Sequence, residues 1–121
     1  MDHTVLIRSD GSAVACGRNL YGQCSPPELP EGLTYVQVAA GMDHTVLIRS
    51  DGLAVACGGN DFGQCSPPEL PEGLTYVQVA AGSCHTVLIR SDGLAVACGG
   101  NHYGQCSLPE LPEGLTYVQV A

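Results

Sequence analysis

The sequence predicts an all-β protein, a β-propeller to which each chain contributes three blades. Three observations favour this fold: an internal repeat of 41 residues, Asp-Gly turns between short β-branched segments, and a proline-rich loop in every copy. Repeats of about 40 residues built from short strands are typical of propeller blades arranged around an axis. A β-solenoid is the alternative, although its repeats are usually shorter and lack a proline-rich loop in each copy.

The three copies of the repeat are nearly identical. The string His-Thr-Val-Leu-Ile-Arg-Ser-Asp-Gly begins at His3, His44 and His85, which are spaced by 41 residues. Each copy continues with Ala-Val-Ala-Cys-Gly, a turn ending in Gly-Gln-Cys-Ser, the loop Pro-Glu-Leu-Pro-Glu-Gly and the segment Leu-Thr-Tyr-Val-Gln-Val-Ala. We therefore predict a single domain over residues 1–121, divided into the repeats 1–41, 42–82 and 83–121.

Within one repeat the pattern predicts three short strands. Residues 4–9 are rich in β-branched and aliphatic side chains, and residues 13–16 form the returning strand. The Asp-Gly dipeptide between them predicts a two-residue hairpin turn in which both residues take positive φ. The three prolines of residues 26–32 exclude a helix, and residues 33–39 alternate along a third strand. Such a sheet cannot bury both faces alone, so neighbouring sheets must cover it.

Charge and hydropathy exclude several classes of partner. Twelve carboxylates against four arginines and no lysine give a formal net charge of −8. Nucleic acids and anionic membranes both attract cationic side chains, so we expect neither as a partner. No run of about eighteen apolar residues predicts a membrane span. The residues after Met1 do not resemble a signal peptide, and the seven cysteines are an odd number, so we expect a cytoplasm-like, reducing compartment.

One combined motif runs from Ala39 to Gln64 and again from Ala80 to Gln105. It reads Ala-Ala-Gly-x-x-His-Thr-Val-Leu-x-x-Ser-Asp-Gly-x-x-x-Ala-Cys-Gly-x-Asn-x-x-Gly-Gln. This motif, which extends over essentially the whole chain in three copies, resembles the regulator of chromosome condensation repeat. It is similar above all to the compact branch of that family, which includes bacterial β-lactamase-inhibitor propellers. The resemblance implies a propeller, typically of seven blades, from a family whose members mostly bind other proteins.

The sequence departs from the family pattern at its cysteines. They stand where the family often has tryptophan or leucine, which implies that they occupy apolar core positions. The guanine-nucleotide exchange of the founding member depends on inserted structure, and no repeat here carries an insertion. The resemblance therefore implies no such activity. The cysteines in question are Cys16, Cys57 and Cys98 at the tryptophan position and Cys24, Cys65 and Cys106 at the leucine position.

The two ends of the sequence carry complementary parts of one blade. Residues 115–121 match 33–39 and 74–80, whereas residues 1–3 match 42–44. Three blades alone would each have to turn by about 120°, and an open arc would expose apolar faces and strand edges. We therefore predict a homodimer of six blades, in which each C-terminal strand completes the partner's first blade, with a nine-bladed ring of three copies as the alternative. The residues expected to close the ring are Thr4, Val5, Leu6, Ile7, Tyr117, Val118, Gln119 and Val120.

No group of residues has the pattern of a catalytic, metal or cofactor site. The recurring cysteine pairs are eight residues apart, unlike the Cys-x₂₋₄-Cys spacing of structural zinc sites. We expect buried free thiols, with disulfides or a metal as alternatives. The histidine that opens each repeat is expected to hydrogen-bond the backbone of the Ala-Ala-Gly turn, as the resemblance implies. We therefore predict no enzyme, no metal and no cofactor.

The repeats differ from one another mostly in loops, chiefly the turn Gly-x-Asn-x-aromatic-Gly. Loops carry binding more often than strands do, and aromatic and arginine side chains dominate protein interfaces. We predict first a non-enzymatic module that assembles with itself, whether natural, engineered or excised, and as the alternative a protein-binding propeller domain. Drift at tolerant positions explains the loop differences equally well. The candidate partner-binding residues are Arg18, Leu20, Tyr21, Asp61, Phe62, His102 and Tyr103.

Overall fold

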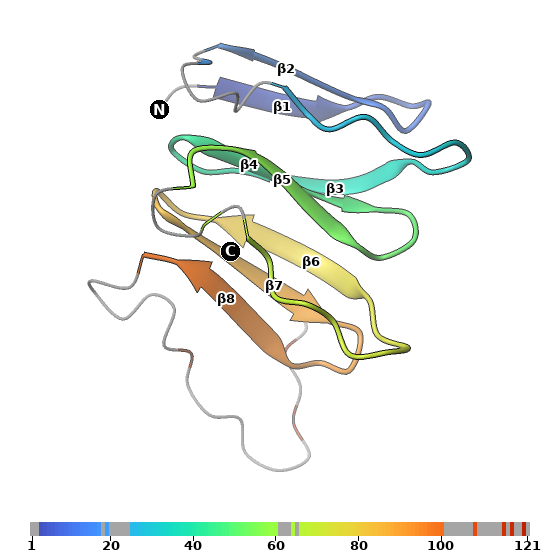
Figure 1. Cartoon of the computed structure of the whole chain (residues 1–121), viewed down its shortest axis with the longest axis vertical. Coiled ribbons are helices and arrows are strands. Elements are labelled where there is room, and N and C mark those ends of the chain that lie inside the picture. Colours follow the sequence, from blue (N-terminus) through green and yellow to red (C-terminus); the bar gives the residue numbers. More distant parts are fainter. Residues whose placement is uncertain are drawn as a thin grey trace.

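Figure 1 shows the computed structural model, which describes residues 3–17, 19, 25–60, 64, 66–100, 108, 115, 117 and 120. These residues form three antiparallel sheets that stack one on the next. The first sheet pairs β1 (His3–Ile7) with β2 (Ala13–Gly17). The second is ordered β3 (Tyr35–Ala40), β4 (His44–Arg49), β5 (Ala54–Gly58), and the third β6 (Tyr76–Ala81), β7 (His85–Arg90), β8 (Ala95–Gly99).

The all-β class is confirmed, as are the three strands of the first two repeats and the first two strands of the third, with small shifts of the strand ends. The third strand begins at Tyr35 rather than at residue 33, because Leu33 still belongs to a turn. Its amide donates a hydrogen bond to the Pro30 carbonyl at 3.2 Å. The register between β3 and β4 shifts between Tyr35 and Gln37, so that a β-bulge leaves Val36 exposed. Within the described ranges, no helix has the length and apolar character that a membrane crossing requires.

The hairpin turn differs from the predicted two-residue turn. Only Gly11 has a positive φ, 84°, while Asp10 does not. The Gly11 amide donates to the Arg8 carbonyl at 2.8 Å, which makes a three-residue loop with glycine in the left-handed position. Asp10 serves through its side chain instead, since its Oδ1 accepts the Ser12 amide at 3.0 Å. The prediction of two positive φ values was therefore wrong.

In the second and third sheets, the arginine that precedes this turn pairs with the aspartate inside the turn. Arg49 Nη2 lies 2.5 Å from Asp51 Oδ2, and Arg90 pairs with Asp92 in the same way. The hydrogen bond from Arg49 holds the pKa of Asp51 below its ordinary value of 3.8. Because these pairs are partly solvated, they fix the loop shape more than they stabilise the fold.

The core lies between the second and third sheets. All residues of β4 from His44 to Ile48 are buried, as the apolar character of this strand on both sides predicts for a sheet between two others. Ile48, Tyr76 and Leu88 form the centre of the apolar cluster. β1, which is the equivalent strand of the first sheet, alternates between half-buried and exposed residues, because no sheet covers its outer face in the described structure.

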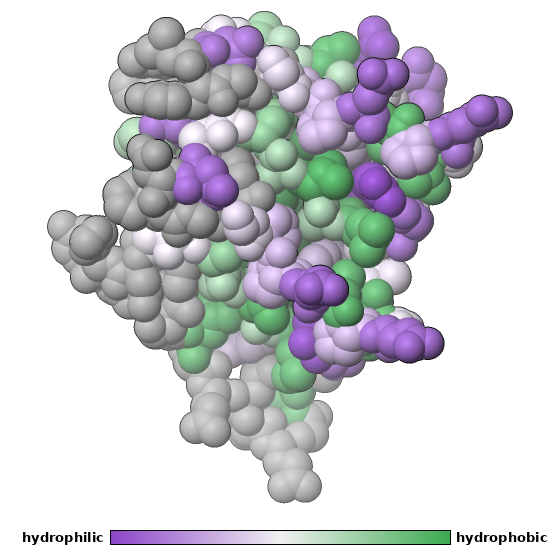
Figure 2. All heavy atoms as spheres, viewed as in Figure 1, coloured by the Kyte–Doolittle hydropathy of each residue, from purple (hydrophilic) through white to green (hydrophobic). Residues whose placement is uncertain are grey.

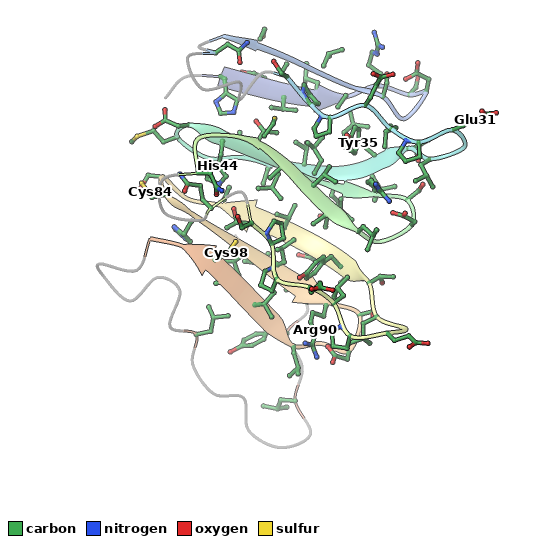
Figure 3. All side chains as sticks on the ribbon, viewed as in Figure 1. Glu31, Tyr35, His44, Cys84, Arg90 and Cys98 are labelled. Atoms are coloured by element: carbon green, nitrogen blue, oxygen red, sulfur yellow. The ribbon has the colours of Figure 1, made fainter. Side chains whose placement is uncertain are left out.

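The two ends of the sheets differ in character. Figure 3 places Glu31 and Arg90 at the end that carries the proline loops and hairpin turns, and His44 and Cys84 at the opposite end. Hydrophilic side chains project mainly from the loop end in the view of Figure 2, with apolar atoms between them over the sheets. The histidines therefore lie where the first strand of each three-stranded sheet turns into the second.

Candidate functional site

The surfaces that join one sheet to the next repeat the same contacts, and they are the most elaborate sites in the described structure. At the hairpin end, a tyrosine amide at the start of one sheet donates to a glycine carbonyl in the turn of the preceding sheet. The pairs are Tyr35 with Gly11, Tyr76 with Gly52 and Tyr117 with Gly93, at 2.7, 2.8 and 2.7 Å.

The glycine in this contact is required by both conformation and space. Gly52 has a φ of +85°, and a Cβ built on it would lie 2.3 Å from the Cβ of Thr75. The threonine is fixed in turn, because its amide donates to Ser91 Oγ at 3.0 Å and its carbonyl accepts the Ser91 amide at 2.7 Å. Sheet two thus rests on sheet three through a backbone contact that has no room for a side chain.

At the opposite end, the histidines of the first two sheets each bond a threonine of the following sheet. His3 Nε2 lies 2.8 Å from Thr45 Oγ1, and His44 Nε2 lies 3.0 Å from Thr86 Oγ1. The expected hydrogen bond to the backbone of the turn is made by the main chain of His44, whose carbonyl accepts the Gly41 amide at 2.8 Å, while its ring bonds Thr86. The ring does pack on that turn, since a Cβ on Gly41 would lie 2.2 Å from His44 Cε1. That packing turns Nε2 toward the neighbouring sheet.

The hydrogen positions of the His44 pair follow from counting donors. Thr86 Oγ1 donates its one hydrogen to the Gln64 carbonyl at 2.8 Å, so it must accept from His44 Nε2. His44 therefore carries a proton on Nε2, while its Nδ1 is buried and without a hydrogen-bond partner. The side chains of both His44 and Thr86 have no exposed surface.

Burial dominates the electrostatics of this histidine. It lowers the pKa of His44 from 6.5 to about 4, because the buried ring cannot be hydrated when it is charged. A hydrogen bond with the His85 backbone raises the pKa, but burial outweighs it, and Nδ1, which would take the second proton, has no hydrogen-bond partner. His44 is therefore neutral at pH 7 and acts as a hydrogen-bond donor between sheets rather than as a general acid or base.

A glutamine links the first strands of neighbouring sheets. Gln37 Nε2 donates to the Val77 carbonyl at 2.9 Å, and Gln78 Oε1 accepts the Val120 amide at 3.2 Å. Tyr117 and Val120 therefore lie beside the third sheet.

The proline loop is fastened to its own sheet by the tyrosine that begins the first strand. Tyr35 Oη donates to the Pro27 carbonyl and Tyr76 Oη to the Pro68 carbonyl, both at 2.5 Å. Burial raises the pKa of both tyrosines. The loop thereby covers one edge of the apolar cluster and keeps its glutamates in solvent, where Glu31 is seen at the loop tip (Figure 3).

Among the described residues, no further sheet covers the outer faces of the stack. Leu6 is 58 % exposed, although the equivalent Leu47 and Leu88 are both 0 % exposed. Thr4 is exposed as well, in contrast to the buried Thr45 and Thr86.

At the other end of the stack the exposure pattern is reversed. His85 and Val87 of β7 are only half-buried, whereas His44 and Val46 of β4 are 0 % exposed. The first sheet therefore bares a threonine and leucine face, and the third sheet a histidine and valine face.

Only some of the predicted site residues lie in the described part of the chain. Thr4, Val5, Leu6 and Ile7 form β1, and Tyr117 and Val120 make the contacts given above. The remaining predicted residues lie outside the described part of the chain. They are Val118 and Gln119 of the ring closure and the loop residues Arg18, Leu20, Tyr21, Asp61, Phe62, His102 and Tyr103.

The cysteines that the structure describes are free thiols. They are Cys16, Cys57, Cys84 and Cys98. The expected burial of the paired cysteines was wrong in degree, because Cys16 is exposed on β2 and Cys57 and Cys98 are half-buried. Their predicted partners Cys24, Cys65 and Cys106 lie outside the described residues. Over the described ranges, no three histidine, cysteine or acidic side chains come together as a metal site would require.

The stacked antiparallel sheets, joined by the same contacts at each junction, define the class of the protein: an array of β-propeller blades. The chain belongs to the regulator of chromosome condensation (RCC1) repeat family, whose sequence model matches residues 2–23, 35–64 and 76–105. The family expected from the sequence motif is thus confirmed. Among curated proteins, no sequence matches the chain.

Solved structures share the fold at low sequence identity. Prp20p from Saccharomyces cerevisiae superimposes with a TM-score of 0.75 at 24% identity, over 93% of this chain and 32% of that one. Human WBSCR16 gives 0.67 at 24% identity, over 84% and 32% of the two chains. The CRINKLY ectodomain of the Arabidopsis thaliana receptor kinase ACR4 gives 0.65 at 20% identity, over 82% and 38%. This chain spans about a third of the length of each of these proteins.

Proposed function

We propose that the chain is a non-enzymatic assembly module that joins a second copy of itself to complete a six-bladed ring. One observation carries the proposal: the face of β1 bares Leu6 and Thr4, whose equivalents in the other two sheets are wholly buried. Because the equivalent leucine is buried at both junctions inside the chain, we expect a further blade to cover Leu6.

The opposite end of the stack offers the matching surface. The half-buried His85 and Val87 correspond to His44 and Val46, which cover the next sheet inside the chain. Joining the two ends is a head-to-tail contact, and such contacts close when the rotation per copy divides a full turn. Two copies give six blades, with one such join at each end of each chain.

The segment beside the third sheet supports the same arrangement. Tyr117 bonds Gly93 as Tyr76 bonds Gly52, and Val120 bonds Gln78 of the third sheet. Extending the pairing of β3 with β4, where Tyr35 opposes Arg49 and Val38 opposes Leu47, would set Tyr117 opposite Arg8 and Val120 opposite Leu6 of the second copy. The first sheet would then have three strands like the others.

The test of this function is the mass in solution. Native mass spectrometry and light scattering of the 121-residue protein should give twice the 12.5 kDa of one chain. A mass of three chains would replace the dimer by a nine-bladed ring. A stable single chain at micromolar concentration would contradict the proposal.

Truncating Leu6 should weaken this self-association about a hundredfold. Burying the exposed part of a leucine is worth about 1.4 kcal/mol, or about tenfold in affinity, and a closed dimer contains two such joins. Sedimentation velocity of Leu6→Ala over a dilution series measures the change. Leu53→Ala is the matched control, since Leu53 is also exposed, at 45 %, but sits in a hairpin loop away from the joining faces. Equal dissociation constants for the two variants would count against the join.

A second candidate function is the binding of another protein through the variable loops. Two observations favour it: the near-identical repeats differ mostly there, and the fold relative Prp20p is described by its binding to Gsp1p and histones. Alanine replacement of Tyr21, Phe62 and Tyr103 together separates the two functions. Loss of a bound protein while the ring mass persists supports binding, and loss of neither supports assembly alone.

A further inference from the structure

The histidine-threonine bond repeats at each junction that the structure describes in full. His3 bonds Thr45 and His44 bonds Thr86, so in both cases the histidine of one blade forms a hydrogen bond with the threonine of the next. The spacing from histidine to threonine is 42 residues in both cases. The pair is therefore a property of the blade junction and not of one repeat.

One histidine and one threonine are left over from this series. His85 has no following sheet within the described structure, and its Nδ1 is buried without a partner, as in His44. Thr4 lies on the exposed face of β1, in the position that Thr45 and Thr86 hold in their buried sheets.

The ring of His85 is already oriented for a further bond. A Cβ on Gly82 would lie 2.0 Å from His85 Cε1 and 2.5 Å from its Nδ1, which matches the 2.2 and 2.5 Å found for Gly41 and His44. The same edge of the ring is thus packed against the same turn. This packing fixes the direction of Nε2 before a partner binds. The side chain therefore loses less conformational entropy when the hydrogen bond forms.

We propose that His85 of one copy donates a hydrogen bond through Nε2 to Thr4 of the second copy, so that the join between copies repeats the internal junction. This inference rests on the proposed self-association and names the polar contact that sets its direction. The contact requires the third sheet of one chain to face the first sheet of the other. First sheet against first sheet would bring together two threonines, and third against third two histidines that are both donors.

The experiment compares the same substitution at two equivalent threonines. Thr4→Val keeps the shape and removes the hydroxyl, so it should raise the dimer dissociation constant about a hundredfold, about tenfold for each of two joins. Thr45→Val removes the equivalent bond inside the chain. It should lower the melting temperature while leaving the dissociation constant within about threefold of the unchanged protein. Thr4→Ser, which keeps the hydroxyl, should restore the original constant.

A double-mutant cycle then ties Thr4 to its partner. Once Thr4→Val is present, His85→Ala should cost much less than it costs alone, because the bond is already lost. An unchanged dissociation constant in Thr4→Val, or additive effects of the two substitutions, would overturn the inference while leaving the dimer intact. A protein that stays a single chain before any substitution defeats the self-association itself, so the two failures are distinct.

Discussion

Replacing Gly52 with alanine should lower the free energy of unfolding by about 4 kcal/mol. A side chain at a φ of +85° costs about 1–2 kcal/mol. The added Cβ would also lie 2.3 Å from both Cβ and Cγ2 of Thr75, and forcing extra atoms into a packed contact costs about 1–3 kcal/mol. The threonine cannot turn away freely, because its backbone is bonded on both sides to Ser91.

Gly73→Ala is the matched control for this prediction. Gly73 has the same φ of +85°, but no atom lies within 4 Å of its added Cβ. Gly73→Ala should lower the free energy of unfolding only by the cost of a side chain at positive φ, about 1.5 kcal/mol. Urea unfolding of both variants, followed by far-ultraviolet circular dichroism, measures the difference. Equal losses in the two proteins would show that the sheets do not meet at Gly52.

Acid should destabilise the protein through His44 before its carboxylates are titrated. A pKa of about 4 in the folded state against 6.5 for the ordinary group means that the unfolded chain binds the proton first. Stability is then complete above pH 6.5 and falls as the pH drops from 6.5 to about 4, by about 3 kcal/mol in all, since each pH unit corresponds to about 1.4 kcal/mol. The pKa of Asp51 lies below 3.8, so its contribution is lost at lower pH.

Two measurements check this pH dependence. The His44 ring protons in the folded protein should titrate near pH 4 by nuclear magnetic resonance. The slope of unfolding free energy between pH 6.5 and 4 should flatten in His44→Gln and persist in His3→Gln, where His44 is still present. A His44 ring that titrates near 6.5 in the folded state would contradict the neutral donor assigned here.

The repeat length and the β-branched strands were sufficient to predict the sheets, because both signals are local. The turn was predicted less well, since an Asp-Gly dipeptide suits a two-residue turn and a three-residue turn alike. What decides between them is the Asp10 side chain, which caps the Ser12 amide and leaves only Gly11 at positive φ. That choice depends on side-chain bonding that a dipeptide preference does not include.

The partners of the histidines could not be predicted from one repeat. Thr86 is 42 residues from His44, and the two meet only because the second and third sheets stack in a particular register. One signal was present: histidine and threonine recur together, adjacent in every copy. Reading that pair as donor and acceptor of neighbouring copies requires knowing that the copies pack face to face. The loop residues expected to bind a partner lie outside the described residues and stay a prediction.

The uniform junctions have a consequence for how such a protein can change its size. The substantial contacts between sheets in the described structure link consecutive sheets, β1 with β3 and then β3 and β4 with β6. An additional 41-residue repeat, inserted at a repeat boundary, would find on both neighbours the same contact residues that the existing repeats use. Duplication of one unit would therefore preserve the hydrogen bonds of every junction, while the number of blades in a closed ring would change with it.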